Sequence, residues 1–141
     1  MDRDVIERKL ESLRRYISRI ESKQPFPLER LETDADLQDI LALNLTQAIQ
    51  TVVDIGMHIL ARTGNRAPET MAEVFDVLDE AGILSPDLAD RMKRAVGFRN
   101  IAVHAYGQVN WRIVFAICER HLSDFREFAR RMVAYLDGAG G

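Results

Sequence analysis

The chain has 141 residues, 47% hydrophobic and 29% charged, which is the size and composition of one globular domain. Its net charge is −3, and its single cysteine, Cys118, excludes an internal disulfide framework and a zinc site built from several cysteines. The longest uninterrupted apolar run has six residues, 113–118, and the first residues form no apolar signal segment. We therefore expect no membrane span, no export and a cytoplasmic location.

The first half of the chain predicts two long helices. The spacing of apolar residues is helical nearly everywhere, and no segment alternates with the period of a strand. One apolar stripe runs along residues 2–21, and the two prolines that follow end this helix. Residues 23–32 are predicted to be a connector. A second helix is expected to begin with Thr33 as its N-cap residue and to end at the turn-forming residues 63–65.

Two further helices are predicted in the middle of the chain. A short one begins at Thr70, which has a glutamate three residues later as in a capping box, and closes at Ala81 and Gly82. The next begins at Ser85, followed by a proline at the first helical position, and runs towards Val103. Residues 105–108 are predicted to form a loop.

The last predicted helix has the most regular pattern. Asn110 is its expected N-cap residue, and apolar residues follow from Trp111 to Leu136 at alternating spacings of four and three. The sequence therefore predicts an all-α fold, an antiparallel four-helix bundle with one additional short helix. We expect one domain over residues 1–137 and a disordered tail over residues 138–141.

Charge is distributed unevenly along the chain. The segment 91–118 has no Asp or Glu and carries +5, so the rest of the chain sums to −8 when the whole has −3. Its charged residues are Arg91, Lys93, Arg94, Arg99 and Arg112. This asymmetry indicates a surface for an anionic partner such as RNA, and Arg91, Lys93, Arg94 and Arg112 are the expected RNA-binding residues. The alternative is a solvated helix face that happens to be basic.

Motifs for metals, nucleotides and phosphate loops are absent from the sequence. Asp54 and His58 lie one helical turn apart, but two ligands do not make a metal site, so we interpret them as a hydrogen-bonded pair that could support a nearby site. His121 lies among charged residues and is expected to be solvated. We expect neither a metal nor a cofactor.

Arg99 stands out on physical grounds. It continues an apolar row formed by Leu88, Met92 and Ala95. An unpaired guanidinium cannot be buried on such a row, so it needs a partner, a cleft or an anion. His104 follows about 140° further round an ideal helix. The two side chains therefore share a site only if the helix ends or bends before His104, or if two chains contribute.

An arginine and a histidine with a nearby tyrosine, Tyr106, suit the cleavage of RNA through its own 2′-hydroxyl. A histidine moves protons near neutral pH, and an arginine stabilises negative charge on phosphoryl oxygens. Spacing alone is a weak indication, because a lone Arg–His pair is more often structural than functional.

The pattern Arg99-x4-His104-x-Tyr106 resembles the R-x4-H-x-Y motif of HepT-like toxins, a branch of the HEPN superfamily. Asn100 matches the polar residue that follows the arginine in HEPN ribonucleases. Three further segments are similar to those of the family, so that the resemblance covers nearly the whole chain; they are residues 54–59, 81–84 and 121–125. The chain departs from the family after the motif, where residues 107–111 differ from the usual aromatic residues.

This resemblance implies a homodimer with its Arg–His pairs in a shared cleft. It implies a metal-independent endoribonuclease, the toxin of a type VII-like toxin–antitoxin pair, with Arg99, Asn100 and His104 as catalytic residues. It also implies an antitoxin, a minimal nucleotidyltransferase of the MNT type, that silences the toxin by transferring AMP to Tyr106.

Two other interpretations remain open. The chain could be a non-catalytic HEPN dimer module that binds a nucleotidyltransferase partner or a nucleotide. It could also be a structural dimerisation bundle in which Arg99 pairs with an acid across the interface. The joint presence of Arg99, His104 and Tyr106 favours the ribonuclease.

Overall fold

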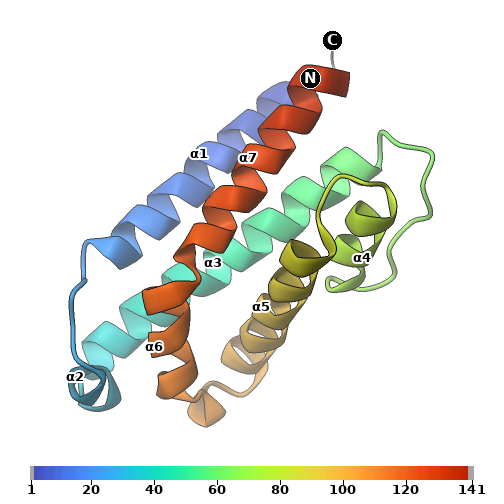
Figure 1. Cartoon of the computed structure of the whole chain (residues 1–141). Coiled ribbons are helices and arrows are strands. Elements are labelled where there is room, and N and C mark those ends of the chain that lie inside the picture. The colour runs from blue at the N-terminus through green and yellow to red at the C-terminus, as the bar shows by residue number, and fades with distance from the viewer. Residues whose placement is uncertain (1, 140–141) are drawn as a thin grey trace.

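The computed structural model describes residues 2–139, and these residues form helices without any strand (Figure 1). In chain order the elements are α1 (Asp2–Glu21), α2 (Leu28–Thr33), α3 (Ala35–Leu60), α4 (Glu73–Glu80), α5 (Pro86–His104), the 3-10 helix η1 (Tyr106–Gln108), α6 (Trp111–Arg120) and α7 (Leu122–Ala139). The predicted all-α fold is confirmed.

The four long helices α1, α3, α5 and α7 run up and down along one another (Figure 1). α1 and α7 lie side by side, with the start of α1 and the end of α7 at the same end of the molecule. An ion pair between Arg3 Nη2 and Asp137 Oδ1, at 2.6 Å, links these two ends. At the opposite end of the bundle α2 packs on α6. Elsewhere, α4 covers part of α3 and α5.

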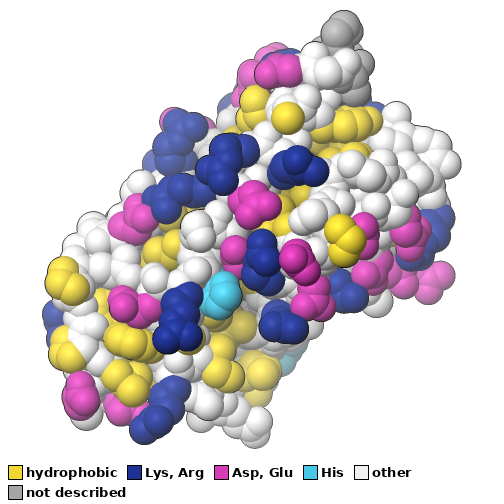
Figure 2. All heavy atoms as spheres, in the orientation of Figure 1, with side chains coloured by type: hydrophobic (Ala, Val, Ile, Leu, Met, Phe, Trp, Pro, Cys, Tyr) yellow, Lys and Arg dark blue, Asp and Glu magenta, His cyan; other side chains and the backbone are white. Residues whose placement is uncertain are grey.

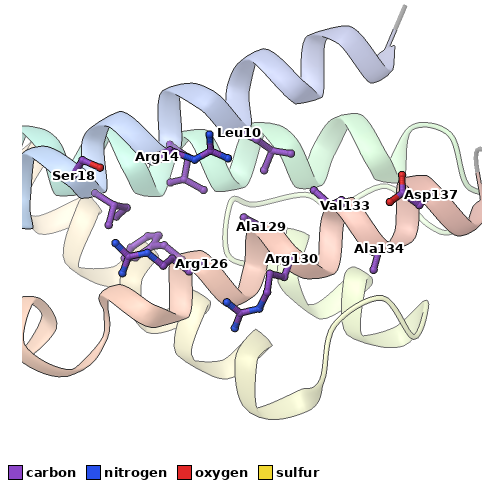
Figure 3. Close-up of a pocket in the computed structure, with 12 residues that line it drawn as sticks. Leu10, Arg14, Ser18, Arg126, Ala129, Arg130, Val133, Ala134 and Asp137 are labelled. Atoms are coloured by element: carbon purple, nitrogen blue, oxygen red, sulfur yellow. The ribbon is translucent and has the colours of Figure 1, made fainter.

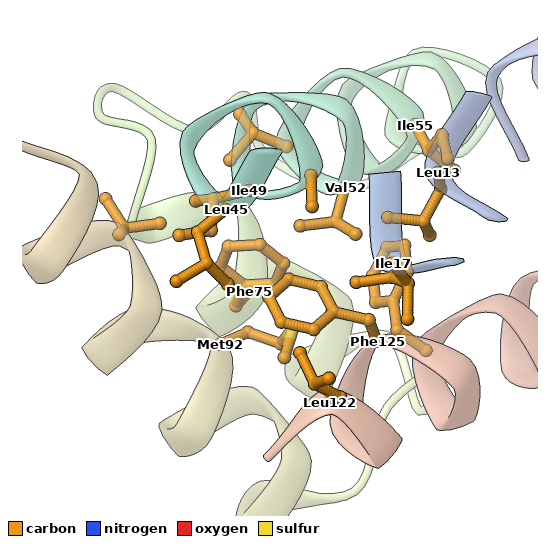
Figure 4. Packing of buried hydrophobic residues seen from close by; sticks show 14 of the residues in the cluster. Leu13, Ile17, Leu45, Ile49, Val52, Ile55, Phe75, Met92, Leu122 and Phe125 are labelled. Atoms are coloured by element: carbon orange, nitrogen blue, oxygen red, sulfur yellow. The ribbon is translucent and has the colours of Figure 1, made fainter. Parts of the chain in front are cut away.

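The hydrophobic core surrounds α3, which contacts every other α-helix of the bundle. In Figure 4, Leu45, Ile49 and Val52 of α3 point into this core. Met92 of α5 and Phe125 of α7 project towards them from the neighbouring helices. Each such side chain stabilises the fold by about 1.5–3 kcal/mol when it is fully buried.

Within the described residues, α3 is the single helix whose length and composition would allow it to cross a membrane. Its most apolar window has a mean hydropathy of 1.3, and 61% of that window is buried inside the bundle. A helix that is apolar around most of its circumference is expected where other helices pack on several sides of it.

Close packing between α3 and α4 depends on Gly56. A Cβ atom at this position would lie 2.5 Å from Cγ1 of Val74 and 3.1 Å from Cδ1 of Leu78. Real Cβ atoms do not come so close to another carbon, so the absence of a side chain allows α4 to approach.

Three predicted helix boundaries are confirmed by their hydrogen bonds or backbone angles. Ser85 Oγ accepts a hydrogen bond from the Leu88 amide at 3.2 Å at the start of α5. Asn110 Oδ1 accepts one from the Arg112 amide at 3.0 Å at the start of α6. After α4, Gly82 has a φ of 76°, a left-handed conformation that favours glycine.

The connector predicted for residues 23–32 is wrong in part, because it contains most of α2. The N-cap of α3 also differs from the prediction. Asp34 Oδ1 accepts a hydrogen bond from the Leu37 amide at 3.1 Å, whereas the hydroxyl of Thr33 donates to the carbonyl of Glu29 at 2.9 Å. Thr33 therefore ends one helix and its neighbour begins the next.

The limits of two other predicted segments also shift. Thr70 Oγ1 accepts a hydrogen bond from the Glu73 amide at 3.1 Å, as a capping residue does, but regular helix begins only at Glu73. At the other end, α7 continues to Ala139, into the tail that was expected over residues 138–141. Residues 140–141 of that expected tail lie outside the described residues.

The last predicted helix is divided into α6 and α7 at His121. The His121 amide still donates to the Ile117 carbonyl at 2.9 Å, but His121 itself leaves the helical conformation, with a φ of −123°. Cys118 and Leu122 are buried on either side of the break. Because the apolar spacing continues across the break, the sequence pattern does not reveal it.

Candidate active site at the end of α5

The motif residues lie on the last two turns of α5 and just beyond it. α5 continues without interruption to His104, and the Ala105 amide still donates to the Ile101 carbonyl at 2.8 Å. The backbone then turns, and Tyr106 begins η1. Arg99 and His104 therefore lie about 140° apart on one regular helix. A single chain does not bring their side chains to one face.

Arg99 is half-buried, and its guanidinium has an amide oxygen as its partner. Nη1 of Arg99 donates a hydrogen bond to Oδ1 of Asn100 at 3.1 Å. Within residues 2–139 it forms no salt bridge, so no carboxylate neutralises its charge. A guanidinium in this state can bind an anion without first giving up an ion pair.

His104 is exposed at the C-terminal end of α5. Its imidazole ring makes no hydrogen bond with any other described residue. Both ring nitrogens are therefore available to exchange a proton with a bound substrate or with water.

Tyr106 is held from two sides. Its hydroxyl donates a hydrogen bond to Oδ1 of Asp39 on α3, and its ring meets that of Trp111 edge to face, with the ring centres 5.8 Å apart. Burial of the hydroxyl and the adjacent Asp39 carboxylate raise the pKa of Tyr106 to about 12. The residue is still 41% exposed.

A shallow hollow of about 200 Å³ adjoins the ring of Tyr106. α3 contributes Asp39, Leu43 and Thr46 to its lining, and the last turn of α5 contributes Val103. Sequence reasoning did not find Asp39, because it lies 67 residues from Tyr106 and no local pattern distinguishes it from other exposed acids of the chain.

The supporting pair predicted on α3 is not formed. The carboxylate of Asp54 accepts a hydrogen bond from Gln50 Nε2 at 3.0 Å and lies 3.8 Å from Nζ of Lys9, whereas His58 makes no hydrogen bond with it. The cause is α1, which packs on α3 and offers a cation to this carboxylate. Residues 2–139 contain no group of three or more His, Cys, Asp or Glu side chains arranged to hold a metal ion.

The predicted basic surface is largely compensated by acids, most of them from other helices and one, Asp90, from the preceding turn of α5. The ion pairs are Arg91 with Asp124 (3.0 Å) and Glu127 (3.5 Å), Lys93 with Asp76 (2.9 Å), Arg94 with Asp90 (2.9 Å) and Arg112 with Glu32 (3.7 Å). Accordingly, Figure 2 shows acidic side chains interspersed among basic ones. The segment that lacks acids in the sequence is therefore not a continuous positive surface in the fold.

The four predicted RNA-binding residues differ in how firmly they are held. Arg94 and Arg112 are 79% and 73% exposed, and ion pairs in solvent contribute only about 0–1 kcal/mol, so a phosphate could replace their partners. Arg91 is different, because it pairs with Asp124, whose side chain is only 12% exposed. His121 Nδ1 lies 3.0 Å from the other oxygen of Asp124, so His121 is not simply solvated as predicted.

A larger hollow of about 820 Å³ lies elsewhere, between α1 and α7 (Figure 3). Leu10 and Val133 contribute to its apolar lining, and Arg14, Arg126 and Arg130 also border it. None of the motif residues takes part, so this groove is separate from the end of α5.

Comparison with known proteins connects the chain to ribonucleases. A family model described as ribonuclease HepT-like matches residues 4–132. An mRNA nuclease HepT of Shewanella oneidensis is 33% identical over 125 residues, which cover 89% of this chain and 93% of the relative. A tRNA nuclease HepT of Aphanizomenon flos-aquae is 28% identical over 132 residues, covering 94% of this chain and 90% of that protein.

Comparison with solved structures gives the same result as comparison with sequences. The fold is similar to that of a tri-AMPylated HEPN toxin of Shewanella oneidensis, solved in complex with an MNT antitoxin. The TM-score is 0.87 at 32% identity, and the match covers 93% of this chain and 98% of that toxin.

Proposed function

Because the chain belongs to the HepT-like ribonuclease family, we propose that it is the toxin of a type VII-like toxin–antitoxin pair and cleaves RNA endonucleolytically, without a metal, in the cytoplasm. The main support for this proposal is that two motif side chains at the end of α5, Arg99 and His104, remain available to a substrate. Arg99 has no carboxylate partner among the described residues, and His104 is exposed with no hydrogen bond to any of them.

The proposed reaction is an attack by the 2′-oxygen of RNA on the adjacent phosphorus. His104 takes the proton of the 2′-hydroxyl, and the bond from phosphorus to the 5′-oxygen breaks. The departing 5′-oxygen takes a proton from water, and a 2′,3′-cyclic phosphate remains on the other fragment. Arg99 stabilises the charge that builds up on the non-bridging oxygens, and Asn100 holds the guanidinium through the 3.1 Å hydrogen bond.

We further propose that the working site lies between two copies of the chain. The angle of about 140° between Arg99 and His104 on one helix supports this, because a second copy can supply what a single face lacks. Exposed apolar side chains near the motif support it too: Ile101 and Val103 on α5 are 46% and 50% exposed. Such side chains are expected where an apolar surface is covered by a partner.

Control by an MNT-type nucleotidyltransferase, through transfer of AMP to Tyr106, completes the proposal. Tyr106 lies two residues after His104 and retains 41% of its exposure, so a transferase could reach its hydroxyl. One or more AMP groups there would introduce bulky anions beside the cleavage site and repel the phosphates of RNA.

The first test is cleavage of total RNA by the purified chain in the presence of EDTA, followed on a gel. We expect cleavage that the chelator does not affect, with products ending in a 2′,3′-cyclic phosphate. A requirement for a divalent metal, or the absence of cleavage by a folded dimer, would contradict the proposal. The second outcome would favour a non-catalytic module that binds its nucleotidyltransferase.

The second test replaces the catalytic groups. Arg99→Ala and His104→Ala should each lower the cleavage rate by about 100-fold or more, because they remove the charge stabiliser and the proton carrier. Arg19→Ala is the matched control, since it removes an exposed arginine of α1 far along the chain from the motif. Parental cleavage by either motif variant would show that the role assigned to that residue is wrong.

A further inference from the structure

Tyr106 contacts Asp39, a residue outside the motif Arg99-x4-His104-x-Tyr106. Asp39 comes from α3, whereas the three catalytic groups of the proposed ribonuclease come from α5. The carboxylate accepts a hydrogen bond from the same hydroxyl that is proposed to receive AMP, with an O–O distance of 2.5 Å.

Asp39 is the charged group that acts on this hydroxyl. Of the elements around Tyr106, α5 contributes the uncharged Ala102 and Val103, and α6 contributes the ring of Trp111. α3 contributes Asp39 together with apolar residues and Thr46. The charge that raises the pKa of Tyr106 is that of Asp39 alone.

This environment makes the tyrosine a poor spontaneous nucleophile. With a pKa of about 12, only about one hydroxyl in 10⁵ is ionised at pH 7. The neutral hydroxyl must therefore lose its proton while the new bond forms, and this requires a base within hydrogen-bonding distance. The acceptor already in place is the Asp39 carboxylate.

We propose that Asp39 is the general base for the modification of Tyr106, so that the toxin itself supplies a catalytic group for its own silencing. The inference rests on the function proposed above, namely that a nucleotidyltransferase partner transfers AMP to Tyr106.

The nucleotide donor in this step is ATP, which the partner binds. The proton of the Tyr106 hydroxyl moves to Oδ1 of Asp39. The phenolic oxygen forms a bond to the α-phosphorus, the bond from that phosphorus to the oxygen bridging it to the β-phosphorus breaks, and pyrophosphate leaves. The Asp39 proton then passes to water.

The same contact orients the hydroxyl. Together the hydrogen bond to Asp39 and the edge-to-face contact with Trp111 fix the direction of the ring. A base and an orienting group have different consequences when Asp39 is changed. Asparagine keeps an acceptor oxygen of nearly the same shape and loses the basicity, so Asp39→Asn separates the two roles.

The experiment follows the intact mass of the chain while it is incubated with its purified nucleotidyltransferase partner and ATP. Asp39→Asn should lower the rate of AMP addition at pH 7 by about 100-fold or more. Between pH 6 and 9 the parental rate should stay nearly constant, whereas that of Asp39→Asn should rise about tenfold per pH unit, because hydroxide then removes the proton. Asp36→Asn, an exposed acid on the preceding turn of α3, is the matched control and should react like the parent.

Circular dichroism of Asp39→Asn shows whether it keeps the parental helical content. Modification of a folded Asp39→Asn within about threefold of the parental rate would overturn the inference. A slow rate with the flat pH profile of the parent would also overturn it, because Asp39 would then only orient the hydroxyl.

The failure of the proposed function looks different. If the parent gains no AMP, or if Tyr106→Phe gains as much AMP as the parent, the proposed control through Tyr106 is wrong and the inference falls with it. Cleavage of RNA by the unmodified parent, measured in the same preparation, reports independently on the ribonuclease.

Discussion

The three motif side chains at and just beyond the end of α5 are held to different degrees, and these differences suit different chemistry. Arg99 is fixed by the amide of Asn100 and keeps its charge uncompensated, whereas His104 projects into solvent. Tyr106 is tied to Asp39 and to a neighbouring ring. A hydrogen-bonded cation, an exposed imidazole and a hydroxyl held by two neighbours suit charge stabilisation, proton transfer and modification, respectively.

The raised pKa of Tyr106 predicts a loss of stability in alkali. The pKa is about 12 in the folded chain against 10.0 for an ordinary tyrosine. The resulting stabilisation is therefore complete below pH 10 and is lost as the pH rises from about 10 to 12. Urea unfolding at pH 9 and pH 11 should show a smaller decrease in the free energy of unfolding for Asp39→Asn than for the parent.

The control for this prediction is Asp36→Asn, which should behave like the parent at both pH values because Asp36 neither accepts the hydrogen bond of the Tyr106 hydroxyl nor shifts its pKa. A decrease in Asp39→Asn equal to that of the parent would mean that the hydrogen bond between Tyr106 and Asp39 does not persist in solution.

The helices that frame the site are positioned by packing on α3. α3 contacts α5 on one side and α1 on another, and α4 contacts both α3 and α5. α3 and α4 pack closely at Gly56, where a Cβ would overlap Val74. Neither Gly56 nor Val74 lines the hollow beside Tyr106, so this contact tests the framework rather than the chemistry.

Gly56→Ala should therefore destabilise the fold although alanine favours helices. Alanine in a helix interior contributes about 0.5–1 kcal/mol relative to glycine, but overpacking against Val74 costs about 1–3 kcal/mol. We expect a lower thermal midpoint, measured by circular dichroism. Gly97→Ala on α5, where nothing lies within 4 Å of the added Cβ, is the control and should keep or raise the midpoint. A higher midpoint in Gly56→Ala would contradict the close packing of α4.

Across the surface of the bundle, two features bear on how the protein works with other molecules. Figure 2 shows acidic side chains among the basic ones over much of this face, and Arg91 and Lys93 form ion pairs with acids of other helices, so the charge segregation of the sequence is largely lost in the fold. Exposed apolar side chains, in contrast, occur next to the motif, at Ile101 and Val103. Association of two copies through the end of α5 is thus better supported by apolar contact than by charge.

The dimer is tested by Val103→Glu. A carboxylate from each copy at the proposed interface would repel the other, so the mass in light scattering should fall from that of two chains to that of one, and RNA cleavage should fall with it. Met57→Glu, on α3, changes a side chain of similar exposure, 49% against 50%, and should remain dimeric and active. A parental chain that is monomeric and cleaves RNA at full rate would exclude the shared site.

Local patterns in the sequence were enough to predict the long helices and several of their ends, but not α2 or the break between α6 and α7 at His121. The stripe along α1, the caps at Ser85 and Asn110 and the turn at Gly82 each depend on residues within a few positions of one another. Short-range hydrogen bonds and helical periodicity fix such features before any distant contact forms. The motif Arg99-x4-His104-x-Tyr106 is local as well, which is why its position at the end of α5 could be predicted.

The remaining features depend on partners that are distant in the sequence. Asp39 meets Tyr106 across 67 residues, and Arg91 meets Asp124 across 33. Likewise, Asp54 forms an ion pair with Lys9 of α1 and not with His58 on its own helix. No local spacing predicts these pairs, because oppositely charged or hydrogen-bonding side chains on different helices meet only after the helices have packed. The packing of helices around α3 therefore determines which charges of the sequence remain available for function.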